Sequence, residues 1–397
     1  MKVAILIDNS MELNKPHPAR VFNEAMSLIH NEFDVTIFCK KGNESTPTKE
    51  IYKGIKIIRC FNYFLGTTEL IHNYIISHIQ LFNTINEKFD VYHCHDTNTL
   101  PIGYILSRRD KAKLIFEAHE YFPDQICREW YGSNEFKYDL TRKLIKARGE
   151  YYKYADKIIT VSETMADVLY KKLNLKEKPQ VLYNTRFKDE FIKIKNSIHI
   201  SLREKFNIPV QKKILLFQGN IEESRGVDII IKSMKYVSNS VFIAAGAVKE
   251  EYYNILKSII IAENLEDIIY FTGSETSERL LQYTYDADIL IYLGKPIIQN
   301  MEYTIPNKFF DYLFSCKPII LSDLCSLKNI MQKYNVGINV NTHDIDIKSI
   351  GKNINSFINN YELLSKISEN MLKIRNLYTW ENEEVKLLSL YNKLFKR

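Results

Sequence analysis

The sequence of 397 residues predicts an α/β protein built from two doubly wound domains. Short apolar runs rich in β-formers alternate with stretches of helical periodicity from the first residue, which indicates parallel strands joined by crossover helices. The alternation breaks once, in the charged segment 186–213, and then restarts. The length also exceeds what one hydrophobic core usually supports. Together these observations predict two similar domains.

The first predicted domain covers residues 1–190. Its strands are the apolar runs "KVAILID", "DVTIFC", "GIKIIRC", "DVYHCH", "KLIFEAH", "KIITVS" and "QVLYN". Apolar residues at helical spacing predict helices near 19–30, 68–86, 137–154 and 163–173. Strands and helices alternate along this half of the chain, as in one doubly wound unit.

The second predicted domain covers residues 208–380. Its strands are "ILLFQG", "VFIAAG", "IIYFTG", "DILIYLG" and "PIILSD", with helices near 227–236, 249–263, 276–285, 307–315 and 325–333. The tail, 381–397, has apolar positions at helical spacing and could pack on the first domain. Two such sheets facing across a cleft would hold a ligand between the domains.

Composition limits the function without identifying it. The net charge of +6 is compatible with an anionic substrate or an anionic membrane surface, and too small to indicate a nucleic-acid partner. The six cysteines are scattered without C-x-x-C pairs, as is usual for reduced thiols. No apolar run approaches the roughly 20 residues of a membrane span. We therefore expect a cytoplasmic protein that at most contacts the inner face of the membrane.

The loop "QGNIEESRGVD", 218–228, joins a predicted strand to a predicted helix. Ser224 stands where an N-cap would begin that helix, and Arg225 lies beside it. Helix N–H groups and a guanidinium would suit a diphosphate. The alternative is an ordinary βα turn with solvated charges, which Glu222 and Glu223 favour.

The stretch "EYTIPNKFFDYLFSCKPII", 302–320, offers a second anion site. Pro306 suits the first position of a helix, which would place Lys308 in the first turn and Asp311 one turn later. A first-turn lysine opposes the helix dipole, and a bound anion would compensate that cost. Asp311 could accept hydrogen bonds from ribose hydroxyls. The alternative is a surface pair of Lys308 with Asp311 on a core helix.

Three features of the first domain carry further hypotheses. His119 ends a predicted strand beside Glu120, where an imidazole could orient a substrate hydroxyl while the carboxylate shares a proton; a structural histidine is the alternative. His93 and His95 would share one strand face, but no third ligand follows at a suitable spacing, so no metal is predicted. The basic, tyrosine-rich stretch 137–154 is either a packed helix or a contact for an anionic lipid surface.

Taken in order, these stretches resemble the retaining GT-B-fold glycosyltransferases of family four (glycosyl transferases group 1) over nearly the whole chain. The segments that carry the resemblance are "HPARVFNEAMSLI", "DVYHCHDTNTLPIGYI", "LIFEAHEYFPD", "ADKIITVSETMADVL", "FQGNIEESRGVDIIIKSM", "YFTGSETSERLLQYTYDADILI" and "IPNKFFDYLFSCKPII". The resemblance implies transfer of a sugar from a nucleotide diphosphate sugar to an acceptor, with retention and without a cofactor or required metal.

The resemblance also implies roles for particular residues. Arg225 and Lys308 would bind the diphosphate, Asp311 the ribose, and His119 would lie near the transferred sugar. The implied donor-binding set is Gly219, Asn220, Arg225, Gly246, Gly273, Asn307, Lys308 and Asp311; the implied catalytic set is His119, Glu120 and Glu302. The sequence departs from the family pattern at Asn220, where a basic residue is common, at Tyr303, which replaces a glutamate with Glu302 one place away, and at the shorter acid Asp311.

We therefore expect a glycosyltransferase of surface polysaccharide or glycoconjugate synthesis, whose partners are a nucleotide sugar and a glycan or lipid-linked acceptor. Two alternatives remain open: a catalytically weak nucleotide-sugar-binding scaffold subunit and a GT-B-fold nucleotide-sugar epimerase. Product analysis without acceptor would separate the epimerase from the transferase.

Overall fold

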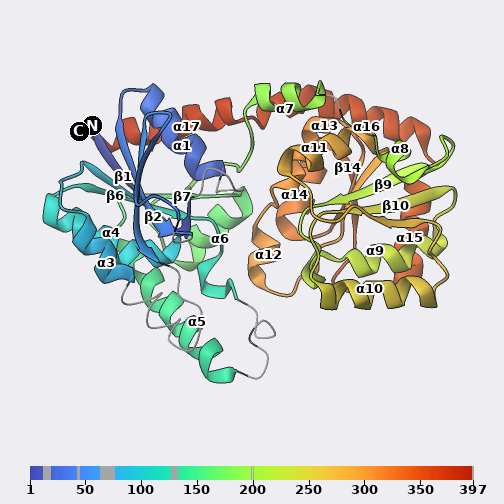
Figure 1. The fold of residues 1–397 in the computed structure, drawn as a ribbon, viewed down its shortest axis with the longest axis horizontal. Coiled ribbons are helices and arrows are strands. Elements are labelled where there is room, and N and C mark those ends of the chain that lie inside the picture. The colour runs from blue at the N-terminus through green and yellow to red at the C-terminus, as the bar shows by residue number, and fades with distance from the viewer. Residues whose placement is uncertain are drawn as a thin grey trace. The chain divides into compact units, whose positions relative to one another are not determined.

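A computed structural model describes residues 1–11, 19–42, 45–62, 77–126, 131, 134–197, 199 and 201–395. The chain divides into two compact units. Unit 1 comprises Met1–Tyr183, Ile298–Asn300 and Asn382–Arg397, and unit 2 comprises Asn184–Ile297 and Met301–Glu381. Each unit contains one sheet with helices packed on it (Figure 1).

Unit 1 contains an eight-stranded sheet in the order β3-β4-β2-β1-β5-β6-β7-β8. All neighbouring strands are parallel except β3 and β4. The strands are β1 (Lys2–Ser10), β2 (Asp34–Lys41), β3 (Lys49–Tyr52), β4 (Ile55–Asn62), β5 (Val91–His95), β6 (Lys113–Ala118), β7 (Lys157–Thr160) and β8 (Gln180–Val181). The helices are α1 (Ala19–His30), α3 (Ser77–Thr84), α4 (Asp96–Asp110), α5 (Glu135–Gly149) and α6 (Glu163–Lys172).

The strand order of unit 1 reverses between β1 and β5. The crossovers β1-α1-β2 and β5-α4-β6 therefore run in opposite directions, and right-handed connections place α1 and α4 on opposite faces. The central strand β5 is buried along its whole length although it includes His93 and His95. Ligands of such sheets bind beyond the carboxyl ends of the strands at the reversal.

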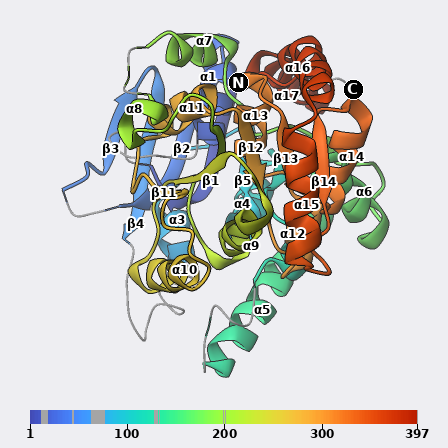
Figure 2. The same ribbon diagram turned by 90° about the vertical axis from the view of Figure 1, so that its right-hand side faces the viewer.

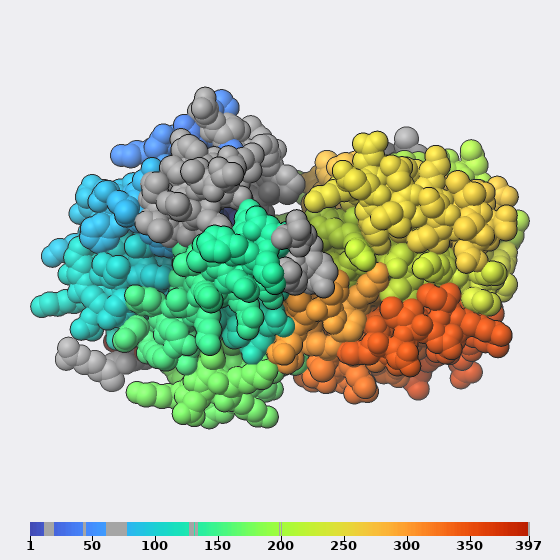
Figure 3. Space-filling view, turned by 90° about the horizontal axis from the view of Figure 1, so that it is seen from below, coloured from blue at the N-terminus to red at the C-terminus, as the bar shows by residue number. Residues whose placement is uncertain are grey.

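Unit 2 contains a six-stranded, all-parallel sheet in the order β11-β10-β9-β12-β13-β14, reversing between β9 and β12. The strands are β9 (Lys213–Gln218), β10 (Ser240–Ala245), β11 (Ile269–Phe271), β12 (Ile289–Tyr292), β13 (Ile319–Ser322) and β14 (Gly337–Val340). Helix α15 packs beside β14 (Figure 2), and the outer face of α10 lies on the surface (yellow in Figure 3).

The helices of the second half are α7 (Lys188–Lys195), α8 (Leu202–Phe206), α9 (Val227–Ser233), α10 (Glu250–Ala262), α11 (Ser277–Asp286), α12 (Gln299–Tyr303), α13 (Lys308–Ser315), α14 (Cys325–Tyr334), α15 (Ile347–Ile358), α16 (Tyr361–Ile374) and α17 (Trp380–Phe395). The tail helix α17 belongs to unit 1 from Asn382 onward, and there the Tyr391 hydroxyl lies 2.9 Å from His93 Nδ1. No helix in the described part of the chain is long and apolar enough to cross a bilayer.

Several elements differ from the sequence analysis. The sequence predicts only a break in the alternation across the charged segment 186–213. In the structure this segment forms α7 and α8 as part of unit 2. Helices α4, α15 and α16 and strands β3 and β14 were not predicted. The expected helix 68–86 is described only from Ser77 onward, and residues 12–18 of the first loop and Cys127 lie outside the described residues.

Candidate functional site

The loop that follows β9 lies at the strand reversal of unit 2. It begins with Gly219, whose backbone N–H donates to Ala245 at the end of β10 (2.8 Å). Gly219 and Gly246 both have positive φ, 108° and 139°. A Cβ at Gly246 would lie 2.2 Å from the Gly219 carbonyl oxygen, so only glycine allows these two loops to touch.

The rest of this loop differs from the predicted capping. Ser224 lies inside a short 3₁₀ turn, Glu223–Arg225, and the N-cap of α9 is Gly226, which makes no side-chain cap. The prediction that Ser224 caps the helix is therefore wrong. Gly226 has φ of 70°, and a Cβ there would lie 1.8 Å from the Leu293 carbonyl oxygen. The loop after β9 is thus packed directly against the chain leaving β12.

Arg225 and Lys308 both contact Tyr292, the last residue of β12. Arg225 Nη1 lies 3.5 Å from the tyrosine hydroxyl oxygen, and Lys308 Nζ lies 4.8 Å from the ring centroid. Glu222 Oε2 lies 3.7 Å from Arg225 Nε, and the Glu222 side chain is half exposed. The structure therefore places the two predicted phosphate-binding cations together.

Lys308 is the first residue of α13, two positions later than the helix start predicted at Pro306. Its Nζ lies 3.8 Å from the centroid of the Phe217 ring and would lie 3.2 Å from a Cβ at residue 219. Lys308 makes no hydrogen bond or ion pair with any described residue. Burial holds the pKa of Lys308 well below its usual range, and the positive charge of Arg225 lowers it further.

Asp311 does not make the surface pair with Lys308 that was weighed from the sequence. Its Oδ1 accepts from Arg186 Nε at 3.0 Å and its Oδ2 accepts from Gln218 Nε2 at 3.0 Å. The residue is buried, and Lys308 forms no surface pair with it. Both carboxylate oxygens of Asp311 are therefore engaged, one of them with the last residue of β9, and its expected contact with a ribose stays a prediction.

Glu302 belongs to a second cluster in unit 2. Its Oε2 accepts the Cys325 N–H at the start of α14 (2.9 Å), and its Oε1 lies 2.6 Å from His343 Nε2. His343 Nδ1 lies 3.2 Å from Asp323 Oδ1. Burial would lower the pKa of His343, but the hydrogen bonds to both carboxylates outweigh it and raise the pKa. The sequence offered no signal for these contacts.

The remaining predicted donor residues lie on exposed loops. Asn220 follows Gly219, Asn307 precedes α13 without capping it, and Gly273 follows β11 with φ of 78° and open space around its Cα. A Cβ at Gly273 would meet no atom within 4 Å. These residues surround the loops described above and carry no contact that assigns them a role.

In unit 1, His119 lies directly after β6 and pairs with a carboxylate other than the predicted one. Its Nε2 lies 3.0 Å from Glu117 Oε1, whereas Glu120 is exposed. Because side chains alternate along a strand, residues 117 and 119 point to the same side. The same alternation puts His93 and His95 of β5 on one side of the sheet, and His95 is in register with Glu117. Applied to both strands, the rule would have found Glu117 as a neighbour of these histidines.

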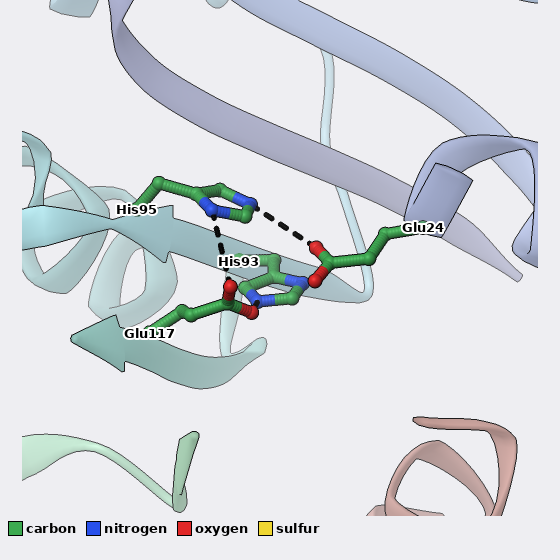
Figure 4. A group of neighbouring side chains, drawn as sticks. All are labelled: Glu24, His93, His95 and Glu117. Carbon is green, nitrogen blue, oxygen red and sulfur yellow. Dashed lines mark hydrogen bonds and ion pairs between the residues drawn. The ribbon is translucent and has the colours of Figure 1, made fainter. Parts of the chain in front are cut away.

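Five charged and polar side chains lie buried next to His119, and we call them the buried cluster. They are Arg20 and Glu24 of α1, His93 and His95 of β5, and Glu117 of β6. All five are at most 1% exposed. Arg20 Nε lies 2.6 Å from Glu117 Oε1 and 2.9 Å from Glu24 Oε1. Figure 4 shows the two carboxylates and two imidazoles turned toward one another. The sequence analysis missed Glu24 and Glu117 as partners of His93 and His95.

Burial and mutual charge set the protonation of this region. Burial raises the pKa of Glu24 well above its usual range, and Glu117 adds to that effect. Burial would also raise the pKa of Glu117, but Arg20, His95 and His119 outweigh it and hold the pKa well below its usual range. Burial would lower the pKa of His119, but Asp96 and Glu117 outweigh it and raise the pKa. One carboxylate charge therefore balances Arg20.

Asp96 supports His119 from the backbone side. Asp96 Oδ1 accepts a hydrogen bond from the backbone N–H of His119 at 3.1 Å. The backbone of Asp96 has φ of 59° although the residue is not glycine. Such a conformation costs about 1–3 kcal/mol and persists where the surrounding structure imposes it. The strain lies at the reversal of the unit 1 sheet, beside the one histidine that reaches from the buried cluster toward solvent.

Comparison with known proteins agrees with this fold. A family model of "Glycosyltransferase Family 4" matches residues 19–185, and a model of "Glycosyl transferases group 1" matches residues 200–373. An uncharacterised glycosyltransferase of Methanocaldococcus jannaschii is 22% identical over 312 residues, which are 77% of this chain and 75% of that protein.

Two solved structures resemble the whole chain. Sucrose-phosphate synthase from Thermosynechococcus elongatus has a TM-score of 0.77 at 15% identity, with 99% of each chain covered. Anabaena HepE in complex with UDP has a TM-score of 0.73 at 13% identity, covering 99% of this chain and 100% of that one. The chain thus has the GT-B fold, with two Rossmann-like domains.

Proposed function

Because this chain belongs to the family-four, group 1 glycosyltransferases, we propose that it transfers a sugar from a nucleotide diphosphate sugar to an acceptor hydroxyl with retention. The observation that carries the donor assignment is the pair Arg225 and Lys308 beside Gly219 at the strand reversal of unit 2. Arg225, together with Lys308 once it is protonated, supplies positive charge that a diphosphate would neutralise, with one exposed carboxylate nearby. UDP is the first nucleotide to test, since HepE was solved with UDP and with UDP-glucose.

The proposed chemistry divides between the units. In unit 2, Arg225 and Lys308 stabilise the negative charge that develops on the departing nucleoside diphosphate. In unit 1, His119 orients a hydroxyl of the sugar or of the acceptor through its exposed edge. Side-chain cations take the place of a divalent metal here, so transfer should continue in EDTA.

The acceptor is proposed to be a glycan or a lipid-linked sugar. Helix α5 extends from unit 1 (Figures 1 and 2) and presents Phe136, which is 75% exposed, and its last turn carries Lys146 and Arg148. Ile145 of this helix is buried, whereas Leu144 is only partly buried, so the helix packs against the unit along part of its apolar face. Sedimentation with vesicles of phosphatidylglycerol, compared with phosphatidylcholine, tests whether this helix contacts an anionic membrane.

The proposal is tested by incubating the protein with a panel of nucleotide sugars. Binding followed by calorimetry and release of nucleoside diphosphate on adding acceptor are expected. The anomeric configuration of the product, read by proton NMR, tests retention. Absence of both binding and release across the panel would reject the proposal. Binding without release would favour a scaffold subunit, and a new sugar formed without acceptor would favour an epimerase.

A further inference from the structure

The buried cluster has a composition that fits a metal site, and its contacts argue for another role. Ligand atoms of Glu24, His93, His95 and Glu117 lie within 4.8 Å of one another, and two imidazoles with two carboxylates suit zinc or iron. Glu24 Oε2, His95 Nε2 and Glu117 Oε1 also lack well-oriented hydrogen bonds among the described residues.

Arg20 already supplies the positive charge in this cluster. Its Nε lies within 2.9 Å of both carboxylates, and the side chain is 1% exposed. A divalent ion bound to the same oxygens would lie a few ångströms from a guanidinium that stays protonated. With Glu24 protonated and Glu117 ionised, the pair Arg20 and Glu117 is electrically balanced, as a buried ion pair must be.

The contacts of this cluster with His119 fix the position of a proton. His119 Nε2 and His95 Nδ1 are 2.8 Å apart, so in the neutral pair one nitrogen carries the hydrogen and the other accepts it. If His95 donated, the lone pair of His119 Nε2 would face the Glu117 carboxylate oxygen 3.0 Å away, which is repulsive. If His119 donates, its N–H is directed at His95 Nδ1, and the positive end of that bond lies beside the Glu117 carboxylate, which is attractive.

The donation from His119 also suits the far side of His95. His95 then carries its hydrogen on Nε2, which lies 3.4 Å from Glu24 Oε2. Glu117 is itself held from its other oxygen, since Oε2 lies 3.1 Å from His93 Nε2. Among the described residues, Nδ1 of His119 has no hydrogen-bond partner, and the His119 side chain is 23% exposed.

We propose that Glu117, held by Arg20 and His93, is a positioning residue that fixes neutral His119 as its Nε2–H form and leaves Nδ1 to bind the ligand. Nδ1 then accepts a hydrogen bond from a sugar hydroxyl, and donates one when His119 is protonated. This inference rests on the proposed function for the identity of the ligand, but the proton position is a property of the protein alone.

The groups that face His119 define what a titration would report. Glu117, His95 and the ionisable Asp96 contact it directly, Arg20 and Glu24 lie behind Glu117, and His93 lies beside His95 with ring centroids 4.7 Å apart. Of these, Glu117 is the carboxylate that contacts the ring itself. Replacing it by an uncharged amide should therefore lower the proton affinity of His119.

The test uses the full-length protein labelled with ¹⁵N-histidine and long-range ¹H–¹⁵N spectra, with His119 assigned from the His119→Gln spectrum. Above the pKa of His119, wild type should show a protonated Nε2 and a bare Nδ1. A protonated Nδ1 in wild type would overturn the proposal without any variant. Because this readout needs no turnover, it stands whether or not nucleotide sugars bind.

The variant Glu117→Gln should mix the two tautomers and weaken proton binding at His119 by at least about tenfold, or one pKa unit. The matched control is Glu383→Gln, which removes another buried carboxylate of unit 1, one that accepts the Tyr183 N–H at 3.0 Å. This control should leave the His119 spectrum and titration unchanged. Equal shifts in both variants would reduce Glu117 to a structural role.

Two further measurements separate the alternatives. If transfer is observed, Glu117→Gln should lower kcat at least tenfold and shift the acid limb of its pH profile, with the KM for nucleotide sugar changed by less than about threefold. Metal analysis of the purified protein should find less than 0.1 equivalent of zinc or iron. A stoichiometric metal that Glu24→Gln removes would overturn the assignment of the cluster.

Discussion

Lys308 should take up a proton when a nucleoside diphosphate binds. In the free protein its ammonium lies 3.8 Å from the Phe217 ring centroid, near Arg225 and without an ion pair to a described residue. Burial and Arg225 therefore hold its pKa well below the usual range. A phosphate oxygen about 4 Å away would contribute about 4 kcal/mol at an effective dielectric constant near 20. That energy equals about three pKa units.

The expected signature is a binding enthalpy that depends on the buffer. At pH about 8 the nucleotide is fully ionised, since a terminal phosphate has a pKa near 6. Titration with UDP in three buffers of different ionisation enthalpy should give an uptake of about 0.5–1 proton per site. The uptake approaches one proton where the pH lies between the pKa of Lys308 in the free protein and its pKa in the complex. In the pH range where Lys308 is neutral in the free protein and charged in the complex, the Kd for UDP should rise by up to tenfold per pH unit.

The variant Lys308→Met should bind UDP about 10–100-fold more weakly, because it loses a charge-assisted hydrogen bond worth about 1.5–3 kcal/mol. It should also show no proton uptake. The control is Lys295→Met, since Lys295 is half-buried in the same unit but already pairs with Asp228 at 2.9 Å. Wild type that binds UDP without proton uptake, or uptake lost equally in the control, would refute this reasoning.

Three further predictions concern the same unit. Arg225→Ala should weaken UDP binding about 10–100-fold and Arg225→Lys by less, measured by calorimetry, because lysine keeps the charge but not the fork. Gly226→Ala should lower the free energy of unfolding in urea by about 2 kcal/mol or more, since its φ is 70° and a Cβ would meet the Leu293 carbonyl oxygen at 1.8 Å. Gly273→Ala, with φ of 78° but open space, should cost about 1 kcal/mol, so equal losses would contradict the role of the contact. His343→Asn should lower the melting temperature more at pH 6 than at pH 9, because a raised pKa stabilises the fold below the unfolded value near 6.5 and this is lost as pH rises through the folded value.

The strands could be predicted because parallel strands covered on both faces are continuous apolar runs. Helix α4 was missed because Pro101 lies inside it, and local propensity counts proline strongly against a helix. Helix α7 was missed because its sequence is mostly charged. Its Phe191 is nonetheless fully buried and stacks on Phe314 with ring centroids 3.9 Å apart. The two buried residues of that helix, Phe191 and Ile194, lie three positions apart, and their packing holds it in place.

The candidate site was predictable where it lies on loops that follow strands. Arg225 and Lys308 were found because a glycine turn and an opposed helix dipole are local features of the sequence. Their surroundings were not, since Arg186 pairs with Asp311 from 125 positions away. Arg20 and Glu117 are likewise 97 positions apart in the sequence, and the topology of the sheet brings them together. Local patterns cannot report which distant charges a fold brings together.

The two polar regions of the structure differ in how their charges are compensated. In the buried cluster, Arg20 is balanced by Glu117, and the protonated Glu24 adds no further charge. The five side chains of this cluster are at most 1% exposed whereas the His119 side chain is 23% exposed, so a ligand is expected to contact this region through His119. Around Lys308, Arg225 is the charged neighbour with the largest effect on the pKa, and Nζ lies over aromatic rings without an ion pair to a described residue. Such a region is stabilised by a bound anion, and this imbalance is the physical reason to assign the donor diphosphate to unit 2.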